Sequence, residues 1–348
     1  MQYKPLGHTG LLVSRLCLGT MTFGQSAGIY KAIAGVDQKG ADDLIKASID
    51  AGINFFDTAD VYSAGQSEKT LGRSLKNLNI ARKDVVLATK VYSRMGPGRN
   101  EVGASRGHIM DAVEGSLRRL QTDHIDLYQI HANDYVTPIE ETLRALDTLV
   151  THGKVRYIGV SNWQAWKIAK ARGISESKNL ARFDTLQAYY SIAGRDLERE
   201  LGPLLEAETI GLLVWSPLAG GLLSGKFSRD NQKPEGSRRS EFDFPIVDKE
   251  RTWKILDVMA PIAKAHDCSP ARISLAWLLT EPVVTSVILG AKRLDQLQDN
   301  LAAADLKLTE EEIKQLDEVS TLPPEYPGWM LATQSADRLD PAIARFKQ

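Results

Sequence analysis

Short apolar runs alternate with longer amphipathic segments along most of the chain. The short runs are rich in β-branched and aromatic residues, which predicts buried strands at residues 15–19, 53–56, 85–89, 124–130, 155–160, 183–187, 210–215 and 285–288. The longer segments repeat apolar residues every three or four positions, which predicts helices at residues 42–51, 66–76, 105–119, 138–151, 163–171, 197–207, 249–265 and 293–303. Strands that alternate regularly with helices favour a closed parallel (β/α)8 barrel, the TIM barrel.

The alternative arrangement of the same elements is an open dinucleotide-binding sheet. That fold requires a glycine-rich turn after its first strand, and no G-x-G-x-x-G sequence follows any predicted strand here. We therefore interpret residues 1–348 as a single barrel domain. Its C-terminal tail, residues 323–348, shows no strong period and is either a lid or a draped terminus.

Three segments fall outside the alternation of strands and helices. A turn flanked by apolar residues at 6–13 predicts a small β-hairpin before the first barrel strand. Two long polar insertions, residues 92–107 and 225–248, leave the C-terminal ends of predicted strands and would overhang the mouth of the barrel. Loops of this length in compact domains are usually functional or disordered, so both are candidates for contact with a ligand.

Composition and charge narrow the class of function. The chain has 348 residues, of which 43% are hydrophobic, and a formal net charge of −1, so no overall field favours nucleic acid or a membrane surface. No apolar run reaches the ~20 residues that span a bilayer, and no signal peptide is recognisable, which predicts a cytoplasmic protein. Cys17 and Cys268 lie far apart, as expected of free thiols in a reducing compartment. The histidines show no metal-ligand spacing, so we expect no metal.

Reactive side chains stand at the ends of three successive predicted strands. Asp57 follows the second strand, and Tyr62 comes five residues later on the loop to the next helix. Lys90 follows the third strand and His131 follows the fourth. Each residue alone has an ordinary structural explanation, such as a turn, a surface cation or a packed ring. Their succession at strand ends, where barrel enzymes keep their catalytic groups, favours an active site.

This order of motifs resembles the aldo-keto reductase superfamily. The matching features are D-x-x-x-x-Y after one apolar strand, T-K after the next, and a third strand that ends in His. The resemblance covers nearly the whole chain up to the tail. It implies a barrel plugged at its base by the N-terminal hairpin, and the reduction of a small-molecule carbonyl by NADPH. Asp57, Tyr62, Lys90 and His131 would then be the catalytic tetrad.

The four side chains make chemical sense together for reduction by hydride. The carbonyl oxygen gains negative charge as hydride arrives, so it needs a proton donor, and Tyr62 would be that general acid. An isolated phenol has a pKa of about 10, which the ammonium of Lys90 would lower, with Asp57 holding the lysine in place. His131 would donate a hydrogen bond to the carbonyl oxygen and orient the substrate.

Other strand ends match positions that bind the cofactor in this family. In the family, a Ser-Asn pair and a glutamine bind the nicotinamide amide, and Ser161, Asn162 and Gln187 match these residues. An aromatic ring stacks on the nicotinamide in the family, and Trp215 matches that ring. The segment after Trp215 resembles the family's pyrophosphate-binding loop. The further expected cofactor-binding residues are Ser216, Pro217, Leu218, Gly220, Gly225 and Lys226, with Asp57 and the first-strand turn Gly19, Thr20 and Met21.

The glycine-rich segment also approaches a different motif. Gly220 to Lys226 nearly spells the phosphate-loop pattern GxxxxGK, which would indicate a nucleoside triphosphatase. Phe227 replaces the Ser or Thr that binds magnesium in that pattern, so we reject this interpretation.

The last predicted strand leads into a turn that resembles the family's adenosine-binding turn. Lys292 and Arg293 stand where a 2′-phosphate could be bound, which NAD lacks, so the resemblance implies NADP(H). The other matching residues are Gly290, Gln296, Asp299 and Asn300. The GAxxxxQLxxN form is similar to the branch that contains bacterial reductases and potassium-channel β-subunits. A basic helix start on the surface is the alternative.

Two functions remain open. The first is an NADPH-dependent carbonyl reductase, and the second is a cofactor-bound regulatory or interaction subunit similar to potassium-channel β-subunits, which retain the same tetrad. The substrate would be shaped by aromatic side chains and loops around Tyr62 and His131, namely Phe23, Tyr30, Trp163, the insertion 92–107 and the tail with Trp329. Neither the substrate nor the oligomeric state is readable from the sequence.

Overall fold

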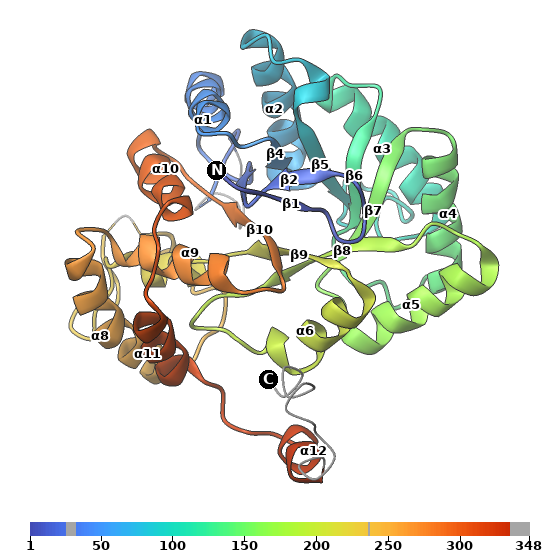
Figure 1. Ribbon diagram of the computed structural model, residues 1–348. Coiled ribbons are helices and arrows are strands. Elements are labelled where there is room, and N and C mark those ends of the chain that lie inside the picture. Colours follow the sequence, from blue (N-terminus) through green and yellow to red (C-terminus); the bar gives the residue numbers. More distant parts are fainter. Residues whose placement is uncertain (26–32, 236, 335–348) are drawn as a thin grey trace.

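The computed structural model describes residues 1–25, 33–235 and 237–334, and its centre is a closed barrel (Figure 1). The parallel strands follow the order β10-β3-β4-β5-β6-β7-β8-β9, with β10 paired to β3 across the closing seam. The predicted (β/α)8 barrel is therefore confirmed. The strands are β3 (Leu16–Gly19), β4 (Phe55–Asp57), β5 (Val86–Val91), β6 (Ile125–Ile130), β7 (Val155–Ser161), β8 (Phe183–Tyr189), β9 (Gly211–Trp215) and β10 (Val284–Leu289).

Helices surround the barrel on its outer side (Figure 1). Those that the amphipathic pattern predicts are α1 (Gln38–Asp50), α2 (Gln66–Asn77), α3 (Arg106–Leu120), α4 (Ile139–Thr151), α5 (Ala165–Lys178), α6 (Leu197–Glu208), α8 (Lys249–Ala265) and α10 (Leu294–Leu301). Four helices were not predicted: α7 (Arg238–Glu241), α9 (Pro270–Thr280), α11 (Glu310–Ser320) and α12 (Gly328–Gln334). Helix α5 is longer than expected, since it starts at Ala165 and continues through Gly173.

Helix α9 shows why the pattern failed there. Ser269 caps its first turn, with its side chain accepting a hydrogen bond from the Arg272 amide, and Pro270 occupies the first helical position. Nearly every side chain from Ala271 to Leu278 is buried, so the helix has no polar face and no 3.6-residue stripe. The Ser269-Pro270 pair that starts the helix was the sequence signal from which it could have been predicted.

Two layers of apolar side chains hold the barrel together. The larger cluster lies between the strands and the surrounding helices. The smaller one fills the barrel interior and contains Leu6, Val13, Cys17, Phe55, Val86, Ala88, Leu127, Leu213 and Ile288. The buried Leu6 and Val13 come from the antiparallel hairpin of β1 (Tyr3–Pro5) and β2 (Leu12–Ser14), which closes the N-terminal end of the barrel as expected.

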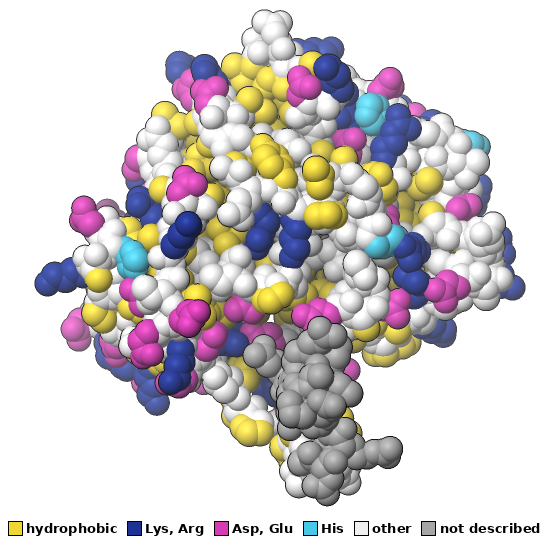
Figure 2. Space-filling model, in the orientation of Figure 1, with side chains coloured by type: hydrophobic (Ala, Val, Ile, Leu, Met, Phe, Trp, Pro, Cys, Tyr) yellow, Lys and Arg dark blue, Asp and Glu magenta, His cyan; other side chains and the backbone are white. Residues whose placement is uncertain are grey.

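The hairpin turn approaches the barrel closely. Gly7 has a φ of +60°, and a Cβ there would lie 2.3 Å from the carbonyl oxygen of Asp184 at the start of β8. Only glycine combines this backbone conformation with so close an approach. Figure 2 shows the same face filled with atoms, and its acidic and basic side chains are interspersed rather than separated by sign.

The described part of the tail leaves the barrel beside α6. Arg199 on α6 forms an ion pair with Glu325 at 3.1 Å and donates to the carbonyl oxygen of Pro323. Helix α12 then lies outside the ring of helices (Figure 1). In the described ranges, no helix combines the length and the apolar character needed to cross a membrane.

Candidate active site

The alternation of side chains along the strands brings polar groups to one end of the barrel. Phe55 and Ala88 face the interior cluster. Because side chains two positions apart share a face of a strand, Asp57 and Lys90 also point inward, at the C-terminal ends of β4 and β5. The same spacing from Leu127 on β6 places Gln129 inside. The barrel thus has an apolar interior that changes to polar side chains at its C-terminal end.

Lys90 is the centre of this polar group. Its ammonium donates to Asp57 Oδ1 at 2.5 Å, to the Thr58 carbonyl oxygen at 2.8 Å and to the Tyr62 hydroxyl at 3.3 Å. The side chain is fully buried. Burial alone lowers the pKa of Lys90, but the Asp57 carboxylate and the Tyr62 phenol outweigh it, so the pKa is raised. Lys90 therefore carries a fixed positive charge at neutral pH.

Asp57 is held by amide side chains from two further strands. Its Oδ2 accepts hydrogen bonds from Gln187 on β8 at 2.9 Å and from Gln129 on β6 at 3.3 Å. Gln187, expected to bind the nicotinamide amide, thus donates to the Asp57 carboxylate in this structure. The sequence analysis missed Gln129, although its spacing of two from the interior Leu127 was a usable signal.

Tyr62 opens a tight turn between β4 and α2. Ser63 and Ala64 have φ values of 49° and 52°, and the Ser63 hydroxyl donates to the Phe23 carbonyl oxygen at 3.1 Å. Burial raises the pKa of the Tyr62 phenol, and the opposing effect of Lys90 is smaller. Lys90 thus lowers the pKa of the phenol as expected, but desolvation raises the pKa by more, so the net direction is upward.

His131 stands beside Tyr62 just after β6. The two rings meet edge to face, with centroids 5.6 Å apart and an interplanar angle of 78°. Burial and the nearby Lys90 lower the pKa of His131 to about 3, so the imidazole is neutral at physiological pH. Its buried Nδ1 has no hydrogen-bond partner among the described residues. The structure thus brings the whole predicted tetrad together.

Ser161, Asn162 and Trp215 form a second group next to His131. Asn162 has a φ of 59°, donates to Ser161 Oγ at 2.9 Å, and lies 3.4 Å from the His131 carbonyl oxygen. Its Oδ1 accepts a hydrogen bond from the Trp215 indole at 3.0 Å. These three residues, predicted from different strand ends, therefore contact one another.

The Trp215 ring has aromatic neighbours that the sequence analysis missed. Phe244, from the insertion 225–248, stacks on Trp215 with centroids 5.6 Å apart and an interplanar angle of 8°. Tyr189, at the end of β8, lies 5.3 Å away in a tilted arrangement. The expectation that this insertion overhangs the barrel mouth holds for the part around Phe244. A nicotinamide that stacked on the same face of Trp215 would have to replace Phe244.

The segment after Trp215 is a compact, glycine-rich bend. Ser216 has a φ of 53°, and its hydroxyl accepts from the Gly220 amide at 3.0 Å. A Cβ at Gly220 would lie 2.3 Å from the Phe244 carbonyl oxygen, so the bend and the insertion are in contact. Lys226 is exposed beyond it. Pro217 and Leu218 precede the short 3-10 helix Ala219–Ser224, and Gly225 ends that helix with a φ of 83°.

The turn after β10 carries the two expected cations on its surface. Arg293 is exposed and forms a bidentate pair with Asp295, at 2.9 and 2.8 Å. The Lys292 amide donates to Gln296 at 3.3 Å. Asp299 is bound to Ser269 and to Arg272 of α9, the latter at 2.6 Å, and its part in the adenosine-binding turn stays a prediction. Gly290 is exposed and Asn300 is buried.

The first-strand turn supports the tetrad from behind. The buried Thr20 hydroxyl lies 3.2 Å from the Asp57 carbonyl oxygen and 2.8 Å from the Ser67 hydroxyl. A Cβ at Gly19 would lie 2.6 Å from the side chain of Ile288, so the residue packs tightly against β10. Met21, next to Thr20, is partly exposed.

The aromatic residues expected to face a substrate differ in their exposure. Phe23 is fully buried, and Trp163 is 4% exposed, packs on Phe183 at 5.5 Å and donates to the Ala132 carbonyl oxygen. Both rings pack inside the protein, as Tyr62 does at 8% exposure, so their contact with a substrate stays a prediction. Trp329 is 49% exposed on α12, and Tyr30 lies outside the described residues.

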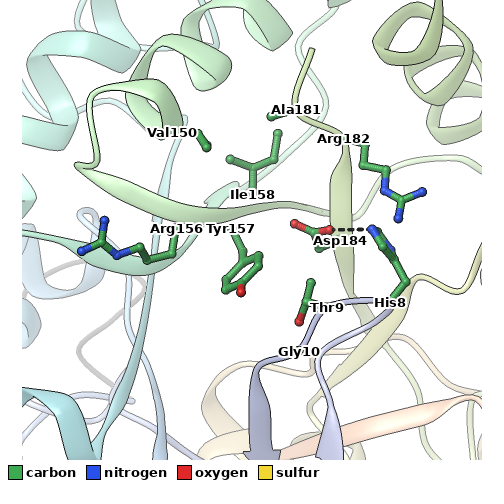
Figure 3. A pocket seen from close by; sticks show the side chains of 10 residues that line it. All are labelled: His8, Thr9, Gly10, Val150, Arg156, Tyr157, Ile158, Ala181, Arg182 and Asp184. Atoms are coloured by element: carbon green, nitrogen blue, oxygen red, sulfur yellow. Dashed lines mark ion pairs between the residues drawn. The ribbon is translucent and has the colours of Figure 1, made fainter. Parts of the chain in front are cut away.

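A cavity of about 290 Å³ lies at the opposite end of the barrel, beside the hairpin turn (Figure 3). His8 and Asp184 point toward each other across it, with His8 Nε2 3.3 Å from Asp184 Oδ1. Arg156 and Tyr157 of β7 and Arg182 complete its polar lining. The cavity is separate from the tetrad, which lies at the C-terminal strand ends.

Comparison with known proteins agrees with this geometry. A family model described as the Aldo/keto reductase family matches residues 15–321. The chain is 38% identical over 327 residues to an uncharacterized oxidoreductase, YrpG, of Bacillus subtilis, in an alignment that covers 92% of this chain and 96% of that protein.

Relatives of other kinds are nearly as similar. A rice protein (Oryza sativa subsp. japonica) named "probable voltage-gated potassium channel subunit beta" is 37% identical over 329 residues, covering 92% of this chain and 96% of the relative. The versiconal hemiacetal acetate reductase of Aspergillus parasiticus is 34% identical over 336 residues, covering 91% and 96%.

Proposed function

Because the chain belongs to the aldo-keto reductase family, we propose that it reduces aldehydes or ketones to alcohols with NADPH, acting on small molecules in the cytoplasm. The observation that carries the proposal is the contact of one buried ammonium with two partners: Lys90 lies 2.5 Å from Asp57 and 3.3 Å from the Tyr62 hydroxyl. This arrangement places a proton donor beside a fixed cation, which is what a carbonyl oxygen requires as it gains negative charge.

The residues present fit a nicotinamide dinucleotide at the mouth. Bound NADPH supplies the hydride. Ser161 and Asn162 offer amide and hydroxyl groups for the carboxamide, and Trp215 offers a flat ring. The bend from Ser216 to Gly220 has backbone N–H groups and glycines that suit a pyrophosphate.

Tyr62 would transfer its hydroxyl proton to the carbonyl oxygen. A raised pKa means that the phenol carries its proton throughout the neutral range, as a general acid must. Lys90 stabilises the phenolate that remains, because its charge is fixed and its ammonium already contacts the phenol oxygen. The neutral His131 would donate a hydrogen bond to the same carbonyl oxygen and set its orientation.

The preference for NADP over NAD would arise at the turn after β10. Lys292 and Arg293 are adjacent, exposed cations just before α10, so a 2′-phosphate there would meet two positive charges and a helix N-terminus. The ion pair between Asp295 and Arg293 would have to break for Arg293 to bind the phosphate. Exposed pairs of this kind are weak, so the exchange costs little.

The test is a screen for NADPH consumption over aldehydes, ketones and sugars, with the alcohol product identified by mass spectrometry. We expect turnover of at least one generic aldehyde, and a lower rate with NADH. If calorimetry shows no binding of NADPH, both the proposed cofactor and the proposed reaction are contradicted.

A second candidate is supported by the relatives named as potassium channel β subunits. In that case the chain would bind NADPH and act as a regulatory or interaction subunit. The two candidates separate in the same experiment, because tight NADPH binding without reduction of any carbonyl would favour the subunit.

A further inference from the structure

The turn at residues 62–65, here called the Tyr62 turn, has a strained backbone. Ser63 and Ala64 are both in the left-handed region, with φ values of 49° and 52°, and neither is glycine. Two such residues in succession persist only where the surrounding structure fixes them. The groups that fix this turn therefore determine where the Tyr62 hydroxyl lies relative to the Lys90 ammonium, 3.3 Å away.

Arg119 of α3 lies directly against the end of the Tyr62 turn, where α2 and α3 run side by side (Figure 1). A Cβ at Gly65, the last residue of the turn, would lie 2.7 Å from Arg119 Cδ and 2.9 Å from its Nε, so the arginine side chain crosses the Gly65 backbone. A Cβ at Gly115 of α3 would lie 2.9 Å from Arg119 Nη1. Two glycines thus provide the space that the guanidinium occupies.

A buried carboxylate keeps Arg119 in this place. Glu68, in the first turn of α2, is fully buried, and its Oε2 accepts a hydrogen bond from Arg119 Nε at 2.6 Å. Its Oε1 accepts from the Thr89 hydroxyl at 2.6 Å. Thr89 precedes Lys90 on β5, and because side chains alternate along a strand, it points to the outer side of the barrel while Lys90 points inward. Glu68 therefore connects the turn that carries Tyr62 to the strand that carries Lys90.

We propose that Arg119 and Glu68 are positioning residues for carbonyl reduction, which keep the Tyr62 hydroxyl in contact with the Lys90 ammonium. The proposal rests on the proposed reductase function. Removal of one partner from a buried ion pair leaves an uncompensated charge, so the contact between α2, α3 and the turn would be lost. A displacement of a reacting group by about 1 Å can lower a rate by roughly 100-fold, so loss of this contact should slow the reaction.

The first test separates rate from stability with a matched pair of variants. Arg119→Met removes a guanidinium that is 21% exposed. Arg82→Met removes one that is 23% exposed and pairs with Asp126 at 2.5 Å, near the N-terminal ends of β5 and β6. Both variants should lower the unfolding temperature, because each breaks a partly buried ion pair. At saturating NADPH and aldehyde, Arg119→Met should lower kcat by about 10- to 100-fold, and Arg82→Met should leave it within about twofold.

The second test observes Tyr62 without any reaction. In protein labelled with 3-fluorotyrosine, the fluorine resonance of Tyr62 is assigned by its absence in Tyr62→Phe. Arg119→Met should shift or broaden this resonance because the turn is released, whereas Arg82→Met should leave it in place. Arg119→Lys restores a positive charge beside Glu68 without the planar fork, so it should recover part of both the rate and the position of the resonance.

The proposal is overturned if Arg119→Met matches Arg82→Met in either readout, since a residue that only stabilises the fold would not move Tyr62 and the rate together. A parent protein that reduces no aldehyde contradicts the proposed function alone, because the fluorine resonance still shows whether Arg119 fixes Tyr62. If Arg119→Met does not fold by circular dichroism, Arg119→Lys and Arg82→Lys give the same comparison with the charge retained.

Discussion

The two ends of the barrel each hold a buried aspartate, and the two are held differently. At the C-terminal end, Asp57 is bound by the ammonium of Lys90 and by the amides of Gln129 and Gln187, from three separate strands. At the N-terminal end, Asp184 has the imidazole of His8 at 3.3 Å. Three side-chain donors on strands thus hold Asp57, whereas Asp184 has one imidazole from a turn and one backbone amide, that of Ile158.

The electrostatic consequence at the N-terminal end is a carboxyl that titrates near neutrality. Burial raises the pKa of Asp184 to about 7, and the hydrogen bond from the Ile158 amide opposes this only in part. Barrel enzymes place chemistry at the C-terminal strand ends and stability at the N-terminal ones. Changes at the two ends should therefore separate, with turnover lost at one and stability altered at the other.

The largest effect should come from Tyr62→Phe, which removes only the phenolic oxygen at the C-terminal end. We expect turnover to fall by at least ~100-fold, the low end for a general acid, with NADPH affinity and the unfolding midpoint nearly unchanged. Steady-state kinetics, calorimetry and thermal unfolding measure the three quantities. Activity within a few-fold of the parent would remove Tyr62 from the mechanism.

The double change Lys292→Ala with Arg293→Ala should act on the cofactor alone. One lost charge-assisted hydrogen bond to a 2′-phosphate lowers affinity roughly 10- to 150-fold, so NADPH binding should weaken and NADH binding should stay almost unaltered. Since both side chains are exposed, the effect should shrink as salt rises. Equal losses for the two cofactors would show that the pair holds the turn and not the phosphate.

Trp215→Ala tests the aromatic contact at the mouth. Loss of a stacked ring weakens binding by roughly 1–3 kcal/mol, with base–aromatic stacking as the analogue, so we expect the NADPH Kd to rise by about 5- to 150-fold. Phe244→Ala is the companion variant, since it frees the face of Trp215 and should leave affinity equal or tighter. Unchanged affinity in Trp215→Ala would assign the ring to packing.

Asp184→Asn should alter stability and leave turnover within about twofold. Because the native pKa of Asp184 is about 7 and that of an unfolded aspartate is ~3.9, the native state binds a proton that the unfolded state lacks between these values. The parent should thus lose stability relative to the variant as pH rises from ~4 to ~7, by up to about 3 kcal/mol. Urea unfolding at roughly pH 4 and pH 7, the two ends of that window, measures the difference.

The smallest effect should be on the pH profile of carbonyl reduction. His131 has a pKa of about 3 and the pKa of Tyr62 is raised, so neither changes protonation between about pH 5 and 8. The kcat/KM of the parent should vary by no more than about twofold in this range from these groups. A clear acid limb near pH 6.5, the ordinary pKa of histidine, would contradict the buried, neutral imidazole.

The tetrad was predictable because each member carries a signal of its own. Asp57, Lys90 and His131 each end an apolar strand, and parallel strands in a barrel bring their C-terminal ends together. Gln129 and Gln187 needed a second step, the alternation of side chains along a strand. The position of Gln187 in the chain could not show that its side chain would donate a hydrogen bond to Asp57.

The path of residues 237–245 could not be predicted, because nothing in their local sequence determines it. Residues 237–245 show no period, and their place depends on Arg239 reaching the Ala219 carbonyl oxygen and on Phe244 meeting Trp215. Helix α9 was missed for the opposite reason, since its side chains are buried on nearly every face. Hydrophobic periodicity reveals helices and strands that face water on one side. Contacts between segments that are distant in sequence produce no such periodicity.

The closing seam of the barrel determines how late in synthesis the fold can be completed. Strand β3 pairs with β10, and the Ser286 hydroxyl donates to the Ser14 carbonyl oxygen across 272 positions of sequence. Contacts so distant in sequence form slowly, since the chain entropy must be lost before they stabilise the fold. Until β10 is in place, β3 and β9 are open sheet edges, which are templates for aggregation. A chain cut before Val284 would keep every tetrad residue and still present two such edges to other molecules.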